Sequence, residues 1–164
     1  MAGNKMKKSE KSSSSKTKRI EPKMETEVSH PDNAIILYTD GASSGNPGPS
    51  GIGVILKYLN HKKEISKHIG MGTNNIAELE AIRTGLTEIK KKNLPVRVYT
   101  DSSYAIGVLT KGWKTKANQE LIASIKHLMG HFNDIRLIKV AGHAGIPENE
   151  RADFLATSAI ETGR

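Results

Sequence analysis

From Ala34 onward, short apolar runs and longer amphipathic stretches alternate in an order that few folds accommodate. Runs rich in β-branched residues and bounded by Gly, Pro or Asn predict strands at 34–40, 51–60, 62–72, 96–100 and 134–140. Apolar residues at helical spacing predict helices at 73–93, 102–112, 117–132 and 147–161. Three successive strands joined by short turns form an antiparallel meander, whereas a strand that follows a helix is expected to be parallel. The order therefore predicts an α/β fold with a five-stranded mixed sheet, three strands antiparallel and two parallel, flanked by α-helices.

The first predicted helix has the clearest apolar face. Its apolar residues fall on one stripe, namely Leu79, Ile82, Leu86 and Ile89. Residues 73–75 offer hydroxyl and amide groups that can cap a helix N-terminus, and the lysines at 90–92 lie where a helix dipole favours cations.

The chain divides into a tail and one domain. Residues 1–33 are rich in Lys and Ser and have almost no apolar periodicity, so they are predicted to be disordered. Residues 34–164 are long enough to bury a core as a single domain. The tail is either a loose nucleic-acid tether or nuclear signal, or a solubilising extension.

Charge and composition narrow the class of protein. The formal net charge is +8 and the isoelectric point is about 9.6, which favours a polyanionic partner and nucleic acid first. The absence of cysteine excludes a disulfide framework. No apolar run reaches the length of a membrane span, and the N-terminus lacks the apolar core of a signal peptide. We therefore expect a soluble, cytoplasmic protein, with a nuclear location open if the source is eukaryotic.

Four acidic residues stand where strands and helices can bring them together. Asp40 and Asp101 each follow an apolar strand run, Glu78 begins a helix beside its apolar stripe, and Asp153 lies inside the last helix. If the strands before Asp40 and Asp101 are adjacent and parallel, both side chains emerge at the same edge of the sheet. When several carboxylates lie so close to one another, they do not all ionise unless cations are present. Ligation by oxygen alone favours Mg²⁺ or Mn²⁺. The pattern predicts a divalent metal site.

Five sequence motifs follow one another around these acids. They are YTDGASSGNPGPSGIG, TNNIAELEA, VYTDSSYAI, KGWKT and VAGHAGIPENERADFLA. Their types and order resemble the type 1 ribonuclease H family over about 130 residues. The resemblance implies a ribonuclease H-like fold and an endonuclease that hydrolyses the RNA strand of RNA–DNA hybrids, leaving 5′-phosphate and 3′-hydroxyl ends. It also implies a monomer that takes hybrid nucleic acid as its partner.

The resemblance assigns roles to five residues. Asp40, Glu78, Asp101 and Asp153 match the catalytic carboxylates, which would hold two Mg²⁺ ions, with Mn²⁺ as a substitute. Asp40 would contact both ions, Asp153 the ion on the nucleophile side, and the remaining two acids the other ion. His143, in the GHAG segment, matches a histidine that transfers protons or assists product release.

The same resemblance assigns substrate contacts. The Gly/Asn turn after Asp40 and the TNN segment are the parts that read 2′-hydroxyls across the minor groove of an A-like duplex. The matching positions are Ala42, Ser43, Ser44, Asn46, Thr73, Asn74, Asn75 and Trp113. Thr73 matches a contact to a DNA phosphate. For Trp113, a place under the DNA strand and plain core packing both stay open.

Two departures from the family concern affinity rather than chemistry. Many relatives carry an additional helix and basic loop between the positions of Tyr104 and Trp113, a handle that grips the hybrid, and here that stretch is short. Met71 stands where relatives often place an arginine that assists Thr73.

Three other readings compete with an active hybrid-specific nuclease. A resolvase or integrase core would share the acids, but the TNN and GHAG motifs argue against it. A catalytically silent nucleic-acid-binding module would be expected to lose at least one acid, and all four are present. An excised reverse-transcriptase domain is compatible with the missing handle, whereas the initial Met and the tail favour a free-standing protein.

Overall fold

The structure, a computed structural model, describes residues 30–142 and 144–163. The strands are β1 (Ile35–Ser43), β2 (Gly48–Tyr58), β3 (His61–Gly72), β4 (Val96–Thr100) and β5 (Ile135–Lys139). The helices are α1 (Asn74–Thr87), α2 (Ser103–Thr110), α3 (Gln119–Met129) and α4 (Pro147–Thr162). None of the helices in these two ranges has the length and apolar character needed to cross a bilayer.

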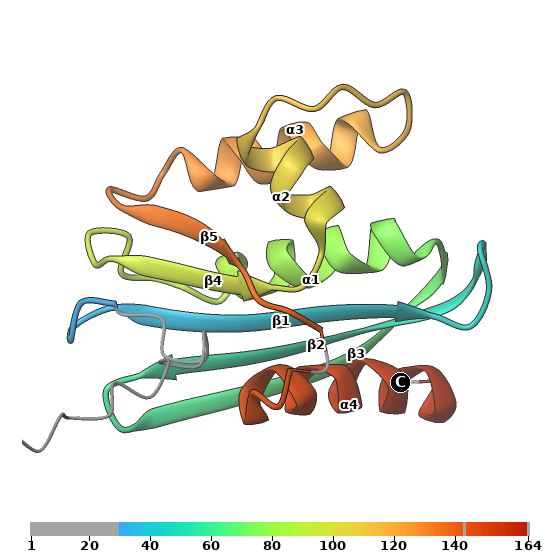
Figure 1. Ribbon diagram of the computed structural model, residues 1–164, viewed down its shortest axis with the longest axis horizontal. Helices are drawn as coiled ribbons and strands as arrows, with labels where there is room; N and C mark the ends of the chain where they lie inside the picture. The colour runs from blue at the N-terminus through green and yellow to red at the C-terminus, as the bar shows by residue number, and fades with distance from the viewer. Residues whose placement is uncertain (1–29, 143, 164) are drawn as a thin grey trace, which may run out of the picture.

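The strands form one mixed sheet in the order β3-β2-β1-β4-β5 (Figure 1). β1 and β2 pair antiparallel, as do β2 and β3, which makes the predicted meander. β4 joins β1 in parallel and β5 joins β4 in parallel, each after a helical crossover. The predicted fold class and strand directions are confirmed.

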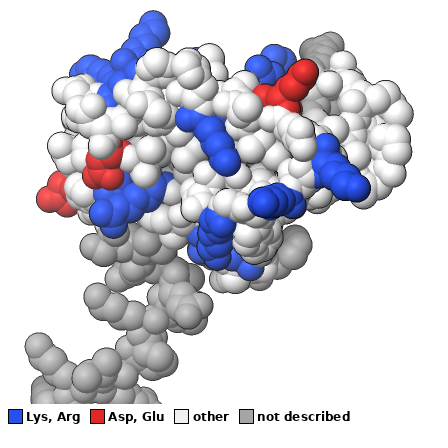
Figure 2. Space-filling view, turned by 90° about the horizontal axis from the view of Figure 1, so that it is seen from above, with Lys and Arg blue, Asp and Glu red and all other residues white. Residues whose placement is uncertain are grey.

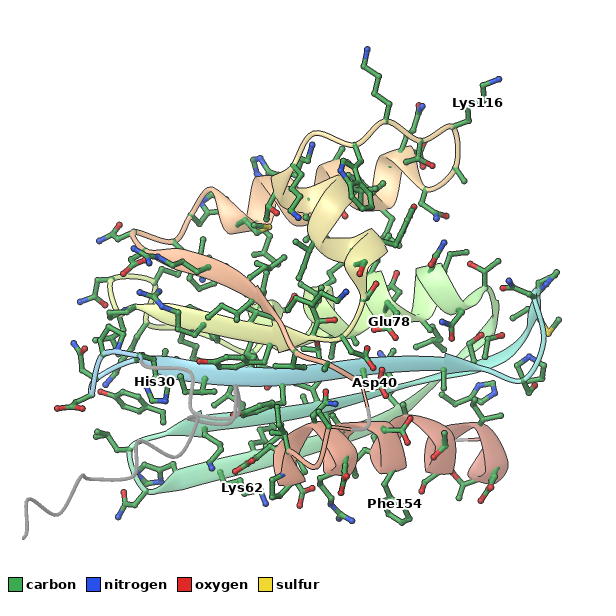
Figure 3. All side chains as sticks on the ribbon, in the orientation of Figure 1. His30, Asp40, Lys62, Glu78, Lys116 and Phe154 are labelled. Carbon is green, nitrogen blue, oxygen red and sulfur yellow. The ribbon has the colours of Figure 1, made fainter. Side chains whose placement is uncertain are left out.

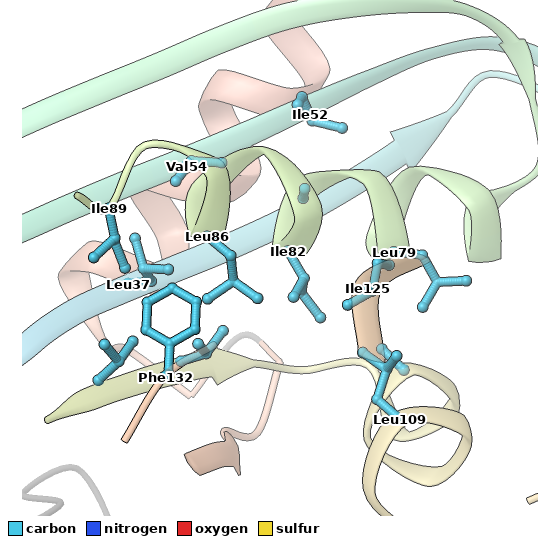
Figure 4. Close-up of a cluster of buried hydrophobic side chains, with 14 of the residues drawn as sticks. Leu37, Ile52, Val54, Leu79, Ile82, Leu86, Ile89, Leu109, Ile125 and Phe132 are labelled. Atoms are coloured by element: carbon cyan, nitrogen blue, oxygen red, sulfur yellow. The ribbon is translucent and has the colours of Figure 1, made fainter. Parts of the chain in front are cut away.

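Helices cover both faces of the sheet. On one face, Leu37 and Val54 pack with Leu79 and Leu86 of α1, and the same core includes Ile125 of α3 (Figure 4). On the other face, Ile55 packs against Ala152 and Leu155 of α4. Because successive side chains of a strand point to opposite faces, β1 and β2 contribute to both cores. Figure 1 shows the outcome, with α1, α2 and α3 on one side of the sheet and α4 alone on the other.

The hairpin between β1 and β2 is tighter than the sequence predicts. We expected β1 to end at Asp40 and residues 41–51 to be a turn, but β1 continues to Ser43 and β2 begins at Gly48. The ladder continues through the glycine-rich residues, since Gly41 pairs with Ile52 and Ser43 with Ser50. Glycine and proline density therefore marks a narrow, tightly packed hairpin tip here rather than a long loop.

Helix α1 ends six residues before the predicted end. It stops at Thr87, so the lysines at 90–92 lie beyond its last turn. The amide of Ile89 donates to Leu86 O at 3.2 Å, a tightened bond that closes the helix end. Ile89 is thereby turned into the main core, where it is 3% exposed. The helix therefore ends early because burying the Ile89 side chain stabilises the fold more than a further helical turn would.

Two glycines of β2 let α4 lie directly on the sheet. A Cβ atom at Gly53 would stand 2.0 Å from Ala152 O, and one at Gly51 would stand 2.3 Å from Ala156 O. No other residue fits at such a distance from helix backbone. Gly53 also pairs with Asp40 in the sheet, so this contact sets α4 beside the acid-bearing part of β1.

The predicted tail lies mostly outside the described residues. Of its 33 residues, the structure describes His30 to Asn33, where the amide of Ala34 donates to Pro31 O at 3.0 Å. The prediction that residues 1–33 are disordered and that the domain comprises 34–164 stays a prediction.

Replacing Gly53 with alanine tests the seat of α4. We expect Gly53→Ala to lower the free energy of unfolding by roughly 1–3 kcal/mol, because the added methyl group forces α4 away from the sheet. Urea unfolding followed by circular dichroism gives the value.

Gly130→Ala is the matched control. Gly130 has right-handed helical backbone angles, and its nearest atom to an added Cβ is His127 O at 3.3 Å. We expect a change within about 0.5 kcal/mol. Equal stability of Gly53→Ala and wild-type protein would show that α4 is not seated by this contact.

Candidate active site

The sheet opens where β1 and β4 part. Their parallel pairing runs as far as Tyr38 and Tyr99, whose rings stack with centroids 4.9 Å apart. Asp40 and Asp101 each lie two residues beyond this last pair. The two carboxylates therefore emerge at the same edge of the sheet, as the sequence predicts, although β1 itself continues past Asp40 by pairing with β2.

Three carboxylates meet at this edge. One oxygen each of Asp40, Glu78 and Asp101 lies within 4.8 Å of the others. Asp40 is 6% exposed and Glu78 is 5% exposed, whereas Asp101 is half-buried. Figure 3 shows Asp40 on β1 and Glu78 on α1 next to each other beside the sheet.

Gly41 brings Glu78 to Asp40. A Cβ atom at Gly41 would stand 2.2 Å from the carbonyl carbon of Ala77 and 2.3 Å from the amide nitrogen of Glu78. The backbone of α1 therefore touches β1 one residue after Asp40. The Gly41 amide also donates to Asp40 Oδ1 at 3.0 Å, which orients that carboxylate.

Crowding and burial resist ionisation of the two buried acids. Burial raises the pKa of Asp40 to about 7; a hydrogen bond with Glu78 acts in the opposite direction, and the charge of Asp101 and the neighbouring Asp153 add to the rise. Burial and the charge of Asp40 raise the pKa of Glu78 well above its ordinary value. Glu78 Oε2 is buried and finds no hydrogen-bond partner among the described residues. The site thus gathers carboxylate oxygens without a cationic group among the causes that set the pKa values of Asp40 and Glu78.

Asp153 approaches Asp40 from α4. It is half-buried, and its carboxyl group interacts with Asp40, although it lies outside the group of three oxygens. One helical turn earlier, Asn149 is 4% exposed and its Oδ1 has no partner among the described residues. All four predicted acids are therefore brought to one place, in an arrangement of three plus one. Their catalytic roles stay predictions.

The predicted substrate residues after Asp40 are tied to the start of α1. Asn46 Oδ1 accepts a hydrogen bond from the Asn74 amide at 3.1 Å, and the Ser43 hydroxyl donates to Gly72 O at 3.1 Å. Thr73 caps α1, its Oγ1 accepting from the Ile76 amide at 3.1 Å. The side chains that remain at this surface are half-buried or exposed, namely those of Ala42, Ser44, Asn74 and Asn75. The tip of the β1–β2 hairpin and the start of α1 therefore form one continuous surface.

Trp113 is a surface residue rather than part of the core. It is 51% exposed, and its ring lies against Gly107 of α2, where an added Cβ would stand 2.1 Å from ring carbons. It lines a groove of about 350 Å³ together with Lys114 and Lys126. Residues 111–118, between α2 and α3, contain no helix.

Two sequence predictions remain open. His143 lies outside the described residues, so its assigned role is untested. Met71 is 70% exposed beside Thr73, which leaves a neutral side chain where an arginine was expected in relatives.

Sequence reasoning missed the small residues that hold the acids in place. Gly41 and Gly53 seat α1 and α4, and Gly142 lies against Asp101, where a Cβ atom would stand 3.0 Å from Oδ2. Glycine directly after Asp40 and glycine inside the β-run of β2 were the available signals, because glycine in a strand often marks close backbone approach. Buried Asn149 had no comparable signal.

Comparison with known protein sequences identifies the group to which the chain is similar. The RNase H family model matches residues 32–161. The ribonuclease H of Desulforamulus reducens is 42% identical over 141 residues, which cover 77% of this chain and 87% of that protein. The ribonuclease H of Saccharopolyspora erythraea is 42% identical over 144 residues, which cover 80% of this chain and 93% of that protein.

Solved structures show the same fold. LC11-RNase H1, isolated from compost, superposes with a TM-score of 0.71 at 33% identity, covering 80% of this chain and 98% of that chain. RNase H1 of the halophilic archaeon Halobacterium salinarum superposes with a TM-score of 0.67 at 28% identity, covering 79% of this chain and 98% of that chain. LC11-RNase H1 in complex with an RNA/DNA hybrid superposes with a TM-score of 0.66 at 31% identity, covering 79% of this chain and 98% of that chain. Sequence and structure agree over nearly all of the described residues, and this chain belongs to the ribonuclease H family.

Proposed function

We propose that this chain hydrolyses the RNA strand of RNA–DNA hybrids with the help of divalent cations, leaving 5′-phosphate and 3′-hydroxyl ends. The observation that carries the proposal is the meeting of Asp40, Glu78 and Asp101 within 4.8 Å, with Asp153 beside Asp40. A ribonuclease H needs such a cluster at a surface that nucleic acid can reach. The half-buried Asp101 and Asp153 form its accessible side.

The donor set fits Mg²⁺ or Mn²⁺. All four side chains offer carboxylate oxygens, which hard divalent cations prefer, and the chain has no cysteine. The raised pKa values of Asp40 and Glu78 and the unpartnered Glu78 Oε2 are what a cation would relieve. Two such ions held by these carboxylates would supply activation of a water and stabilisation of the leaving 3′ oxygen at phosphorus.

The chain's own residues divide the remaining work. Asp40 belongs to the three-oxygen group and also interacts with Asp153, so it would contact both ions. Glu78 and Asp101 would help to hold one ion, and Asp153 would help to hold the other. His143, by the resemblance, transfers a proton or assists product release.

The turn and the start of α1 supply a surface for an A-like duplex. Asn46, Asn74 and Asn75 present amide groups on one exposed surface, and Thr73 stands at the helix N-terminus, where backbone amides favour a phosphate. The related LC11-RNase H1 binds an RNA/DNA hybrid. This exposed surface and the hybrid complex of the relative support the same substrate class here.

Basic side chains extend this surface. Figure 2 shows lysine and arginine spread over the face above α2 and α3, with few acidic residues among them. Lys111, Lys114, Lys116 and Lys126 are exposed around Trp113. They supply phosphate contacts in the region where the longer handle is missing.

Asp40→Asn tests the carboxylate cluster. We expect the loss of at least about three orders of magnitude in hybrid cleavage, because the residue shared by both ion positions no longer carries charge. A labelled RNA–DNA hybrid with Mg²⁺ measures it, beside RNA and DNA duplex controls. Glu120→Gln, an exposed acid on α3, should retain wild-type turnover. Near wild-type activity of Asp40→Asn would refute the assignment.

The same variant has a consequence for stability without metal. Asp40 has a pKa of about 7 when folded, against about 3.9 in an unfolded chain, so from about pH 4 to 7 the folded protein holds more protons and loses stability as pH rises. We expect Asp40→Asn in EDTA to be more stable than wild type by roughly 1–3 kcal/mol at pH 8 and nearly equal at pH 4. Urea unfolding at both pH values measures this, and saturating Mg²⁺ should reduce the difference. A difference independent of pH would assign the effect to packing.

Removing residues 1–29 tests a contribution of the tail to binding. We expect a higher KM for hybrid at low salt, a difference that shrinks as salt screens phosphate contacts, and unchanged kcat. Full-length protein with Lys5, Lys7, Lys8 and Lys11 replaced by glutamine separates charge from length. An unchanged KM at low salt would leave only a solubilising role.

A further inference from the structure

Two exposed histidines form a pair at the end of α3. His127 and His131 are four residues apart, and their rings meet edge to face with centroids 5.0 Å apart and planes at 89°. Residues at this spacing lie on the same helix face. His127 is in the last turn of α3, and the His131 amide donates to Leu128 O at 3.2 Å just beyond it. The backbone therefore holds both rings on one side of the helix end.

The pair is remote from the carboxylates. β5 begins shortly after His131, at Ile135, which is paired with Val96 at the start of β4. Asp101 follows the opposite end of β4. A ligand bound by the histidines would therefore not share the carboxylate site.

The separation of the rings fits two ligands of one ion. A metal–nitrogen distance of about 2.0–2.1 Å and near-tetrahedral or square-planar angles would place two imidazole centroids roughly 4.5–5.2 Å apart. The observed 5.0 Å lies in this range. Histidines at i and i+4 of a helix are also the spacing that holds zinc in HExxH sites.

The chemistry of the pair differs from that of the acid cluster. Imidazole nitrogen suits Zn²⁺, Ni²⁺ and Cu²⁺, whereas the carboxylates suit Mg²⁺. The C-terminal end of a helix carries partial negative charge, which favours a cation, while Lys126 in the same turn opposes it. Among the described residues no third histidine or acid completes the pair, so water would take the remaining positions.

We propose that His127 and His131 form a surface site for a borderline transition-metal ion, Zn²⁺, Ni²⁺ or Cu²⁺, that clamps the end of α3. Both rings act as neutral ligands through one nitrogen each. The ion joins the last turn of the helix to the residue after it, so the folded chain binds it better than the unfolded chain and gains stability from it.

Zinc binding to tag-free full-length protein tests the proposal. In excess Mg²⁺, which competes with Zn²⁺ for the carboxylates, titration with Zn²⁺ should shift the ring NMR signals of His127 and His131 together and raise the thermal midpoint. His127→Ala and His131→Ala should each weaken binding at least about tenfold, because a second ligand on the same scaffold acts at high effective concentration. Hybrid cleavage in Mg²⁺ should stay at the wild-type level for both variants.

His61→Ala is the matched control, since His61 is exposed on β3 and has no ring contact with any described residue. It should leave zinc affinity unchanged. Loss of the zinc-dependent midpoint shift in the two pair variants, beyond any change seen in EDTA, supports a metal site. Wild-type zinc affinity in both pair variants would overturn it and leave only a contact between rings, as would an equal loss in His61→Ala.

Discussion

The closeness of helix backbone to sheet backbone is the constraint on which the rest of this molecule depends. Gly41 and Gly53 lie in contact with main-chain atoms of α1 and α4, from opposite faces of the sheet and at the level of Asp40. Any side chain at these points would move a helix, and with it Glu78 or Asp153. The geometry of the acid cluster is therefore set by the absence of Cβ atoms rather than by bonds between the acids.

That geometry is unfavourable in itself. Buried carboxyl groups with raised pKa values and an unpartnered oxygen reduce the stability of the metal-free chain. The loss is offset elsewhere, by the core that Leu37, Val54 and Leu86 build between the sheet and α1. The packing of this core holds β1 and α1 in place, so the acids stay close together despite their mutual repulsion.

The regular spacing of apolar residues made much of the fold and of the acid cluster predictable from the sequence. Strand order, the stripe through Leu79 and Ile82, and the placing of Asp40 and Asp101 beyond paired parallel strands all follow from local patterns. The end of α1 and the continuation of β1 to Ser43 did not, because burial of Ile89 and pairing with β2 are tertiary effects. The position of Trp113 was open for a related reason, since a tryptophan near lysines suits either a core or a surface until Gly107 shows where the ring rests.

The strand order leaves β3 and β5 with one unpaired edge each within the described part of the chain. Such edges invite pairing between copies, yet β3 carries Lys62, Lys63 and Lys67, and β5 carries Arg136 and Lys139, all exposed. Two copies meeting edge to edge would bring these cations together. Like charges on the two edges therefore oppose such pairing. This repulsion weakens under high salt, which screens the charges, and when a long polyanion neutralises them, so a polyanion bound along the edges removes the charge that opposes strand pairing there.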